Sequence, residues 1–244
     1  VINLSSNWYK KGTQTFDGIL IEELPIESCS QAVGDVLFAV SKVVFQTILS
    51  FVPENTVVVN SAGNCSIEVT EDTALPGGLN SPNLLVVGGF EAHASNEFNK
   101  CEDPVNLHYE SNFGEKVDTV APYITETTNG TVRGTSFAAP LVASIAALMR
   151  SIDPTLTPGE IRNILHETAF PIFNEVDSVD GTKHVTKPVA TSDRWCPSSS
   201  NYPYGARLNI KGAIARTIEG LNLPSTPADI AITAGDKTTT LTWD

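Results

Sequence analysis

The stretch Thr56–Asn64 reads TVVVNSAGN and decides the fold class. Its apolar, β-branched beginning is typical of a strand that is buried on both faces, as strands of parallel sheets are. Upstream, Val1–Ser5 forms a short apolar strand, and the apolar spacing after Ser30 predicts a helix over Gln31–Phe51 that ends before Pro53. A strand, a helix and a second strand make a βαβ unit, so the two strands should be parallel.

The predicted first helix carries one broad apolar face, which is formed by Val33, Val36, Leu37, Val40, Val43, Val44 and Ile48. Two further buried strands are predicted, at Leu84–Gly88 and Val117–Ala121. Three more helices are predicted, at Phe137–Arg150, at Pro158–Thr168 behind a capping box, and at Ile210–Glu219 behind Asn209. Pro140 would lie in the first turn of its helix, where its missing N–H has no intrahelical partner. The fold class is therefore α/β.

The composition excludes several classes of function. The 244 residues carry 15 Lys plus Arg against 28 Asp plus Glu, for a net charge of −13, and 41% of the residues are hydrophobic. The chain can bury a core, but it lacks the basic surface on which nucleic-acid binding and polybasic membrane attachment depend. No apolar run approaches the roughly 18 residues of a membrane span.

The stretch Gly134–Pro140 reads GTSFAAP and places a serine at the start of an apolar helix. The end of such a helix offers unpaired N–H groups and a partial positive charge, which stabilise a developing oxyanion. Gly134 lets a substrate backbone approach closely. An ordinary helix cap would explain Gly-Thr-Ser alone, but the whole heptapeptide favours a nucleophile at Ser136.

Asn64 follows a buried strand, at the carboxyl edge of the sheet where sites form in α/β folds. Its side chain can donate an N–H to an oxyanion. The alternative is that Asn64 only occupies a left-handed turn position, which asparagine tolerates. Together with the serine run, the catalytic interpretation is preferred.

These runs resemble the subtilisin-like serine proteases, or subtilases. Gly134–Pro140 is similar to the nucleophile motif of that family, Ser61–Asn64 to its oxyanion-hole segment, Ser111–Pro122 to the strand before the nucleophile, and Gly205–Asn209 to its closing turn. The resemblance implies a three-layer α/β/α fold with a mostly parallel sheet, of which this chain is the C-terminal part. The similarity covers roughly residues 1–222.

The resemblance also implies roles for individual residues. Ser136 would be the nucleophile of an endopeptidase that works through an acyl-enzyme, and Asn64 with the Ser136 N–H would form the oxyanion hole. The residues expected to contact an extended peptide substrate are Ser5, Ser6, Asn7, Ala62, Gly63, Gly134 and Thr135. The segment Ser5–Asn7 departs from the Ser-Leu-Gly that is common in the family.

The base and the acid of the triad are expected upstream of Val1, because the family order along the chain is Asp, His, Ser. The four histidines, at positions 93, 108, 166 and 184, are interpreted as surface or structural residues. The chain alone should therefore be inactive, and its exposed sheet edge and apolar surface predict marginal stability and aggregation.

The four cysteines, Cys29, Cys65, Cys101 and Cys196, include no C-x-x-C pair, which disfavours a metal cluster. They are either free buried thiols or disulfides of an exported protein, and we favour a Cys65–Cys101 pair because both residues follow predicted strands. No cofactor is expected. Structural calcium is common in the family, but no acidic cluster has the spacing of a dedicated calcium loop.

Residues 223–244 begin with a Pro-rich linker and resemble the opening of a fibronectin type III-like domain, with a plain C-terminal tail as the alternative. The whole protein is expected to be secreted or extracellular, which includes a location at the cell surface, and to be monomeric. One functional alternative is a pseudoprotease that only binds peptides. A lipase-like α/β-hydrolase is disfavoured, because its motif needs Gly where Ala138 stands.

Overall fold

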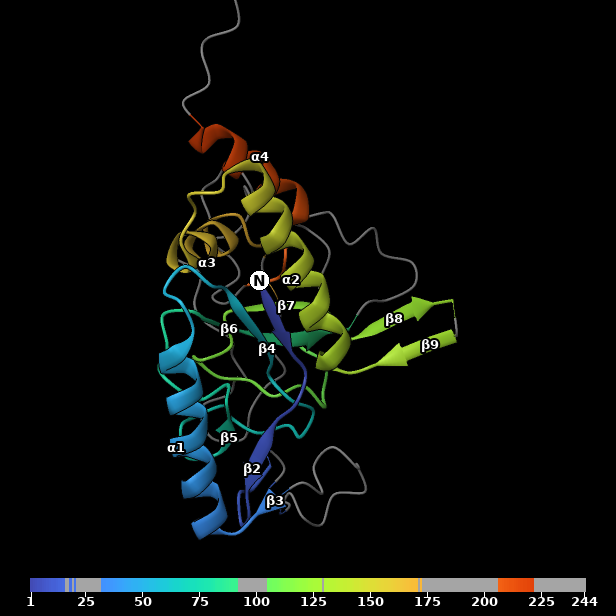
Figure 1. Cartoon of the computed structure of the whole chain (residues 1–244). Helices are drawn as coiled ribbons and strands as arrows, with labels where there is room; N and C mark the ends of the chain where they lie inside the picture. Colours follow the sequence, from blue (N-terminus) through green and yellow to red (C-terminus); the bar gives the residue numbers. More distant parts are fainter. Residues whose placement is uncertain are drawn as a thin grey trace, which may run out of the picture.

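The computed structural model describes residues 1–15, 18, 20, 32–91, 105–128, 130–170, 172 and 206–221. In chain order the elements are β1 (Ile2–Leu4), β2 (Trp8–Lys10), β3 (Ala32–Val33), α1 (Asp35–Phe51), β4 (Val58–Ser61), β5 (Ala74–Leu75), β6 (Leu84–Phe90), β7 (Thr119–Pro122), β8 (Ile124–Thr127), β9 (Gly130–Arg133), α2 (Thr135–Ile152), α3 (Pro158–Glu167) and α4 (Ile210–Gly220). Figure 1 shows them.

The central sheet has the order β1-β4-β6-β7, and all its pairings are parallel. Val58 of β4 lies opposite Ile2 on one side and Leu84 on the other, so the predicted βαβ unit is confirmed. β4 and β6 are buried along their whole length, as their β-branched sequences predicted. The predicted strands at 84–88 and 117–121 are also confirmed, as β6 and β7.

Side chains on the two faces of the sheet pack into two separate parts of the core. Val57, Val59, Leu85 and Val87 pack with α2 and with residues of α3 and α4. Their neighbours Val58, Leu84 and Val86 point the other way and pack with the loops around Ile67 and Leu107. Side chains alternate between the faces because successive strand residues point to opposite sides. Figure 1 shows α2 crossing the sheet with α3 and α4 beyond it. The architecture is a mixed α/β fold with a mostly parallel central sheet, consistent with the predicted α/β/α fold.

Helix α2 starts two residues earlier than predicted, at Thr135, so Pro140 lies in its second turn and not in its first. Without an N–H, Pro140 cannot bond the carbonyl of Ser136 four residues before it. The hydroxyl of Ser5 donates to that carbonyl instead, at 3.3 Å. Because Pro140 has no N–H, the Ser136 carbonyl is available to Ser5. This hydrogen bond connects the start of α2 with the segment that follows β1.

By length and composition, α2 is also the one helix in the described residues that could cross a membrane, which the search for apolar runs missed. However, 44% of its residues are buried inside the fold. Ala138, Ala139, Val142 and Ala146 are among them and pack against the sheet. The apolar character of α2 is accounted for by this position in the core.

Helix α1 starts later than predicted, and most of its apolar face is exposed. The helix begins at Asp35 after the short strand β3, and not at residue 31. Its buried contacts are made through Phe38 and Ser41, with Phe45 and Leu49 partly buried, whereas most of the predicted apolar face is exposed. The exposed residues, with their exposed fractions, are Val36 80%, Leu37 50%, Val40 53%, Val43 61%, Val44 48%, Ile48 53% and, one turn further, Phe51 82%. The predicted end of the helix before Pro53 is confirmed.

Two small sheets were not predicted. β3, β2 and β5 form one beside α1, and β8 and β9 form an antiparallel hairpin that projects from the body of the molecule (Figure 1). The Asn129-Gly130 dipeptide was a hairpin signal that the sequence analysis did not use. The predicted caps of α3 and α4 are confirmed, whereas the predicted cap Ser30 lies outside the described residues and α1 begins after Gly34, which makes no side-chain cap bond. Thr157 and Glu160 form the capping box of α3, and Asn209 accepts from Gly212 at the start of α4.

Candidate active site

The two motifs singled out in the sequence meet at one edge of the sheet. Asn64 lies three residues beyond the carboxyl end of β4, and Ser136 lies in the first turn of α2. The Oδ1 atom of Asn64 accepts hydrogen bonds from both the backbone N–H and the hydroxyl of Thr135, each at 2.9 Å. The residue next to Ser136 thus holds the Asn64 side chain directly.

The same hydroxyl links the helix to the backbone of the asparagine loop. The N–H of Gly63 donates to Thr135 Oγ1 at 3.1 Å, and this oxygen in turn donates to Asn64. Thr135 is fully buried. Because Oδ1 accepts hydrogen bonds from the helix N-terminus, the amide nitrogen of Asn64 lies at the other corner of the planar carboxamide.

Gly134 is required beside this carboxamide for two reasons. Its φ of +127° belongs to a region that side chains rarely adopt, and a Cβ atom there would lie 3.2 Å from Nδ2 of Asn64. Glycine therefore lets the strand–helix junction come close to the asparagine. The sequence analysis assigned Gly134 to substrate approach, and the structure adds this contact with Asn64.

The side chain of Ser136, in the first turn of α2, contacts the segment that follows β1 and is partly exposed. Its Oγ donates to the backbone carbonyl of Ser5 at 3.3 Å, while the Ser5 hydroxyl donates to the Ser136 carbonyl at the same distance. The helix N-terminus around Ser136 supplies the partial positive charge expected of an oxyanion site.

The predicted peptide-binding residues divide into an exposed and a buried set. Ser5 and Ser6 are exposed beside Ser136. Asn7 is buried, and its amide donates to Ser61 Oγ at 3.0 Å while its oxygen accepts from Asn60 at 3.2 Å. The Asn7 side chain is thus used to hold the end of β4. Ala62 and Gly63 are buried in the loop beneath Asn64, and their contact with substrate stays a prediction.

Two of the four histidines lie in the described residues, and both have structural contacts. His166 is buried, and its Nε2 lies 2.8 Å from the backbone oxygen of Asp118. Burial lowers the pKa of His166, which the nearby Asp118 carboxylate opposes. His108 is buried and stacks on Tyr123, with 3.6 Å between ring centroids. Positions 93 and 184 lie outside the described residues.

Cys65 is buried directly after Asn64 and is disulfide-bonded. This excludes the free-thiol alternative for Cys65. The other three cysteines, Cys101 among them, lie outside the described residues, so the Cys65–Cys101 pairing stays a prediction. Across the described ranges, His, Cys, Asp and Glu side chains do not gather in groups of three or more that could hold a metal ion.

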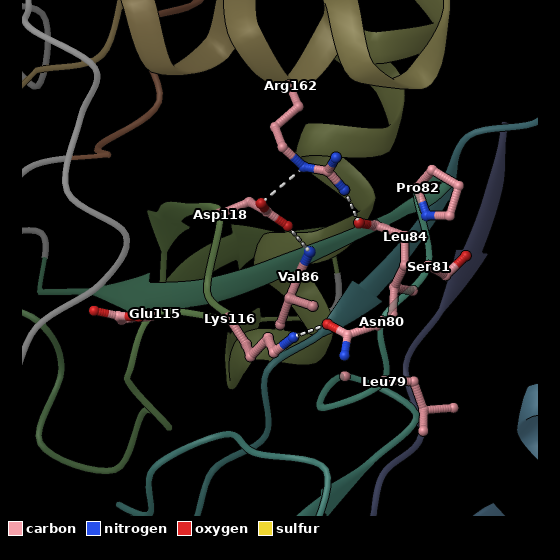
Figure 2. A pocket seen from close by; sticks show the side chains of 11 residues that line it. Leu79, Asn80, Ser81, Pro82, Leu84, Val86, Glu115, Lys116, Asp118 and Arg162 are labelled. Atoms are coloured by element: carbon pink, nitrogen blue, oxygen red, sulfur yellow. Dashed lines mark hydrogen bonds and ion pairs between the residues drawn. The ribbon is translucent and has the colours of Figure 1, made fainter.

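A pocket of about 390 Å³ lies at the opposite, amino edge of the sheet (Figure 2). There Asp118, just before β7, accepts from the backbone N–H of Val86 at 2.8 Å and from Arg162 Nε of α3 at 2.9 Å. Arg162 also donates to the carbonyl of Leu84. Burial raises the pKa of Asp118, and the Arg162 guanidinium opposes that effect. Asp118 and Arg162 bond each other and the start of β6, so at one wall of the pocket they clamp α3 to the sheet. This clamp was not predicted from the sequence.

Two solved structures and one family profile are similar to this chain. A protease from Pseudoalteromonas arctica PAMC 21717 is 24% identical over 72% of this chain and 46% of its own, with a TM-score of 0.44. A chain from a structure of subtilase cytotoxin SubAB assembly is 20% identical over 73% of this chain and 55% of its own, with a TM-score of 0.50. The chain thus spans about half the length of these structures. The sequence profile of the subtilase family, peptidase S8, matches residues 1–206. Because that match covers most of the 244 residues, the chain belongs to the subtilase family.

Proposed function

We propose that this chain carries the nucleophile and the oxyanion hole of a serine endopeptidase. The observation that carries the proposal is the pair of hydrogen bonds from Thr135 to Asn64, which brings the two motifs to one edge of the sheet. A serine at a helix start beside an oriented carboxamide is suited to acyl transfer. Membership of the subtilase family supports the same chemistry.

In the proposed reaction, Ser136 Oγ attacks the carbonyl carbon of a peptide bond after a base has taken its proton. The resulting oxyanion accepts hydrogen bonds from Asn64 Nδ2 and the Ser136 backbone N–H. Collapse of the tetrahedral intermediate releases the amine and leaves an acyl-serine, which water then hydrolyses. The exposed Ser5–Ser6 segment beside Ser136 would pair with the extended substrate.

The base and its acid partner are proposed to come from polypeptide outside this chain. His108 and His166 both have structural contacts elsewhere in the fold, and the chain spans about half the length of its structural neighbours. We therefore propose that residues 1–244 alone are inactive. The disulfide at Cys65 and the net charge of −13 support a secreted, soluble and monomeric whole protein. No cofactor is proposed, and neither is a nucleic-acid or membrane partner.

The boundary at residue 222 and the fibronectin type III-like segment at 223–244 stay predictions, because residues 222–244 lie outside the described ones.

Active-site labelling tests the proposal. The longer polypeptide that includes the expected Asp and His, its Ser136→Ala variant and residues 1–244 alone would each be treated with a fluorophosphonate probe. A matched control is Ser144→Ala, which removes an exposed serine from the same helix. We expect labelling of the longer wild-type and Ser144→Ala proteins only. Equal labelling of the Ser136→Ala variant would refute the nucleophile, and peptide binding without any labelling would favour the pseudoprotease.

A further inference from the structure

Asn112 lies beneath the loop that carries Asn64, and its side chain forms hydrogen bonds with the loop backbone both before and after Asn64. Its Nδ2 donates to the carbonyl of Ala62 at 2.8 Å, and its Oδ1 accepts from the N–H groups of Cys65 at 2.9 Å and Ile67 at 3.2 Å. Its own backbone N–H donates to the carbonyl of Gly63 at 2.9 Å. Asn112 is fully buried. A single residue thus bonds the backbone at four positions of this loop, namely residues 62, 63, 65 and 67.

Tyr9 of β2 also contacts this loop. Its hydroxyl is hydrogen-bonded to the backbone of Asn64 and to the side chain of Asn112, and burial raises its pKa. A Cβ atom on Gly63 would lie 2.2 Å from this hydroxyl and 2.5 Å from Nδ2 of Asn112. Gly63 also has a φ of +104°, so any side chain at this position would be strained as well as too close to both groups.

Two independent sets of contacts therefore determine where the Asn64 amide points. Thr135 orients the carboxamide, whereas Asn112, with Tyr9, fixes the backbone from which the carboxamide projects. An oxyanion donor acts only if it is already placed about 3 Å from the developing charge, and a displacement of about 1 Å can cost about 100-fold in rate. The loop geometry thus has a direct chemical consequence.

We propose that Asn112 is a positioning residue for the reaction and acts through Asn64. This inference rests on the proposed function. A purely structural role would lower the stability of the whole domain without a specific effect on the oxyanion step. A positioning role requires that the effect of losing Asn112 depends on the presence of Asn64.

A double-mutant cycle in the longer, active polypeptide separates the two roles. We expect Asn112→Ala to lower kcat by about 100-fold with KM changed less than about twofold, because an oxyanion contact is made only in the transition state. In the Asn64→Ala background the same substitution should lower kcat by less than about twofold. Asn112→Asp, which keeps the shape and the acceptor but not the donor to Ala62, should be intermediate.

Asn83→Ala is the matched control, because Asn83 is also buried but bonds the Pro53 carbonyl at the opposite edge of the sheet. Its kcat should stay near that of wild type at a temperature where all variants are folded. Equal loss of kcat from Asn112→Ala with and without Asn64, or an effect on KM alone, would overturn the proposal. So would an equal loss of kcat in Asn83→Ala.

A second measurement keeps the inference separate from the proposed function. In NMR spectra, Asn112→Asp should broaden or shift the side-chain amide signals of Asn64, whereas Asn83→Ala should leave them unchanged. Unchanged Asn64 signals in Asn112→Asp would overturn positioning, whatever the enzyme assay shows. Full activity of Ser136→Ala would instead refute the proposed function, and the NMR result would still decide the role of Asn112.

Discussion

The exposed apolar stripe of α1 predicts how residues 1–244 behave when they are expressed alone. Val36, Val40 and Val43 are between 53% and 80% exposed, so folding of the described chain gains little from them. Replacing all three with Gln keeps the net charge and should change the free energy of unfolding by less than about 0.5 kcal/mol per site.

The same substitutions should act strongly on self-association. Burial of a valine side chain contributes about 1.5 kcal/mol or more when it is complete, so the exposed part of each valine is worth about 1 kcal/mol in an aggregate. Loss of about 3 kcal/mol over three sites corresponds to about a 100-fold weaker association. Light scattering and sedimentation of the wild-type and triple-Gln chains would measure this, with urea unfolding as the check on stability.

Phe38→Ala is the contrasting variant. Phe38 lies on the same helix but is 4% exposed, so its loss should cost about 3–5 kcal/mol and increase aggregation. The argument fails if the triple-Gln chain aggregates as fast as wild type while it remains folded. It also fails if the triple-Gln chain loses as much stability as Phe38→Ala, because the valines would then be part of the core.

Three further predictions concern the site and its support. Thr135→Val removes the hydroxyl that donates to Asn64 and should lower kcat of the longer polypeptide by about 10-fold or more, whereas Thr135→Ser should retain most activity; equal rates would contradict the bridge. The pKa of His166 in the folded chain lies below its ordinary 6.5, so on acidification the unfolded chain binds a proton at a higher pH than the folded chain does. The free energy of unfolding should therefore decrease as the pH falls below 6.5. Urea midpoints between pH 7.5 and 5.5 would show this, and His166→Gln should flatten the profile. Arg162→Met leaves the Asp118 carboxylate without its cation and should destabilise by about 3 kcal/mol, whereas the double variant with Asp118→Asn should recover part of that loss; a midpoint unchanged in Arg162→Met would refute the clamp.

The fold could be predicted as far as local patterns specify it. The apolar runs at Val57–Val59 and Leu84–Val87 are typical of strands buried on both faces, and in the structure they lie at the start of β4 and in β6. The caps at Thr157 and Asn209 were equally readable, because a cap is made by residues within one turn of each other. The short strands of the second sheet were not, since β2 and β3 pair through contacts distant in sequence.

The apolar face of α1 shows why a pattern can mislead. Its spacing predicted correctly that the residues form a helix, but periodicity does not say which neighbour covers the apolar side. In the described chain that helix is packed through Phe38 and Phe45, and the broad valine face remains exposed. A sequence pattern shows that one face of a helix is apolar. Only the tertiary packing shows whether another element covers that face.

For the candidate site, the amino-acid sequence by itself determined the identities of Ser136 and Asn64 and the kinds of element that carry them, since a helix start and a strand end are local features. Only the tertiary structure decided that Thr135 bonds the Asn64 carboxamide, that the Ser5 hydroxyl takes the carbonyl left open by Pro140, and that Asn112 holds the loop from beneath. These partners lie 50 to 131 residues apart in the chain. Hydrogen bonds over such separations form only once the parallel strands bring their carboxyl ends to one edge, so no local pattern encodes them.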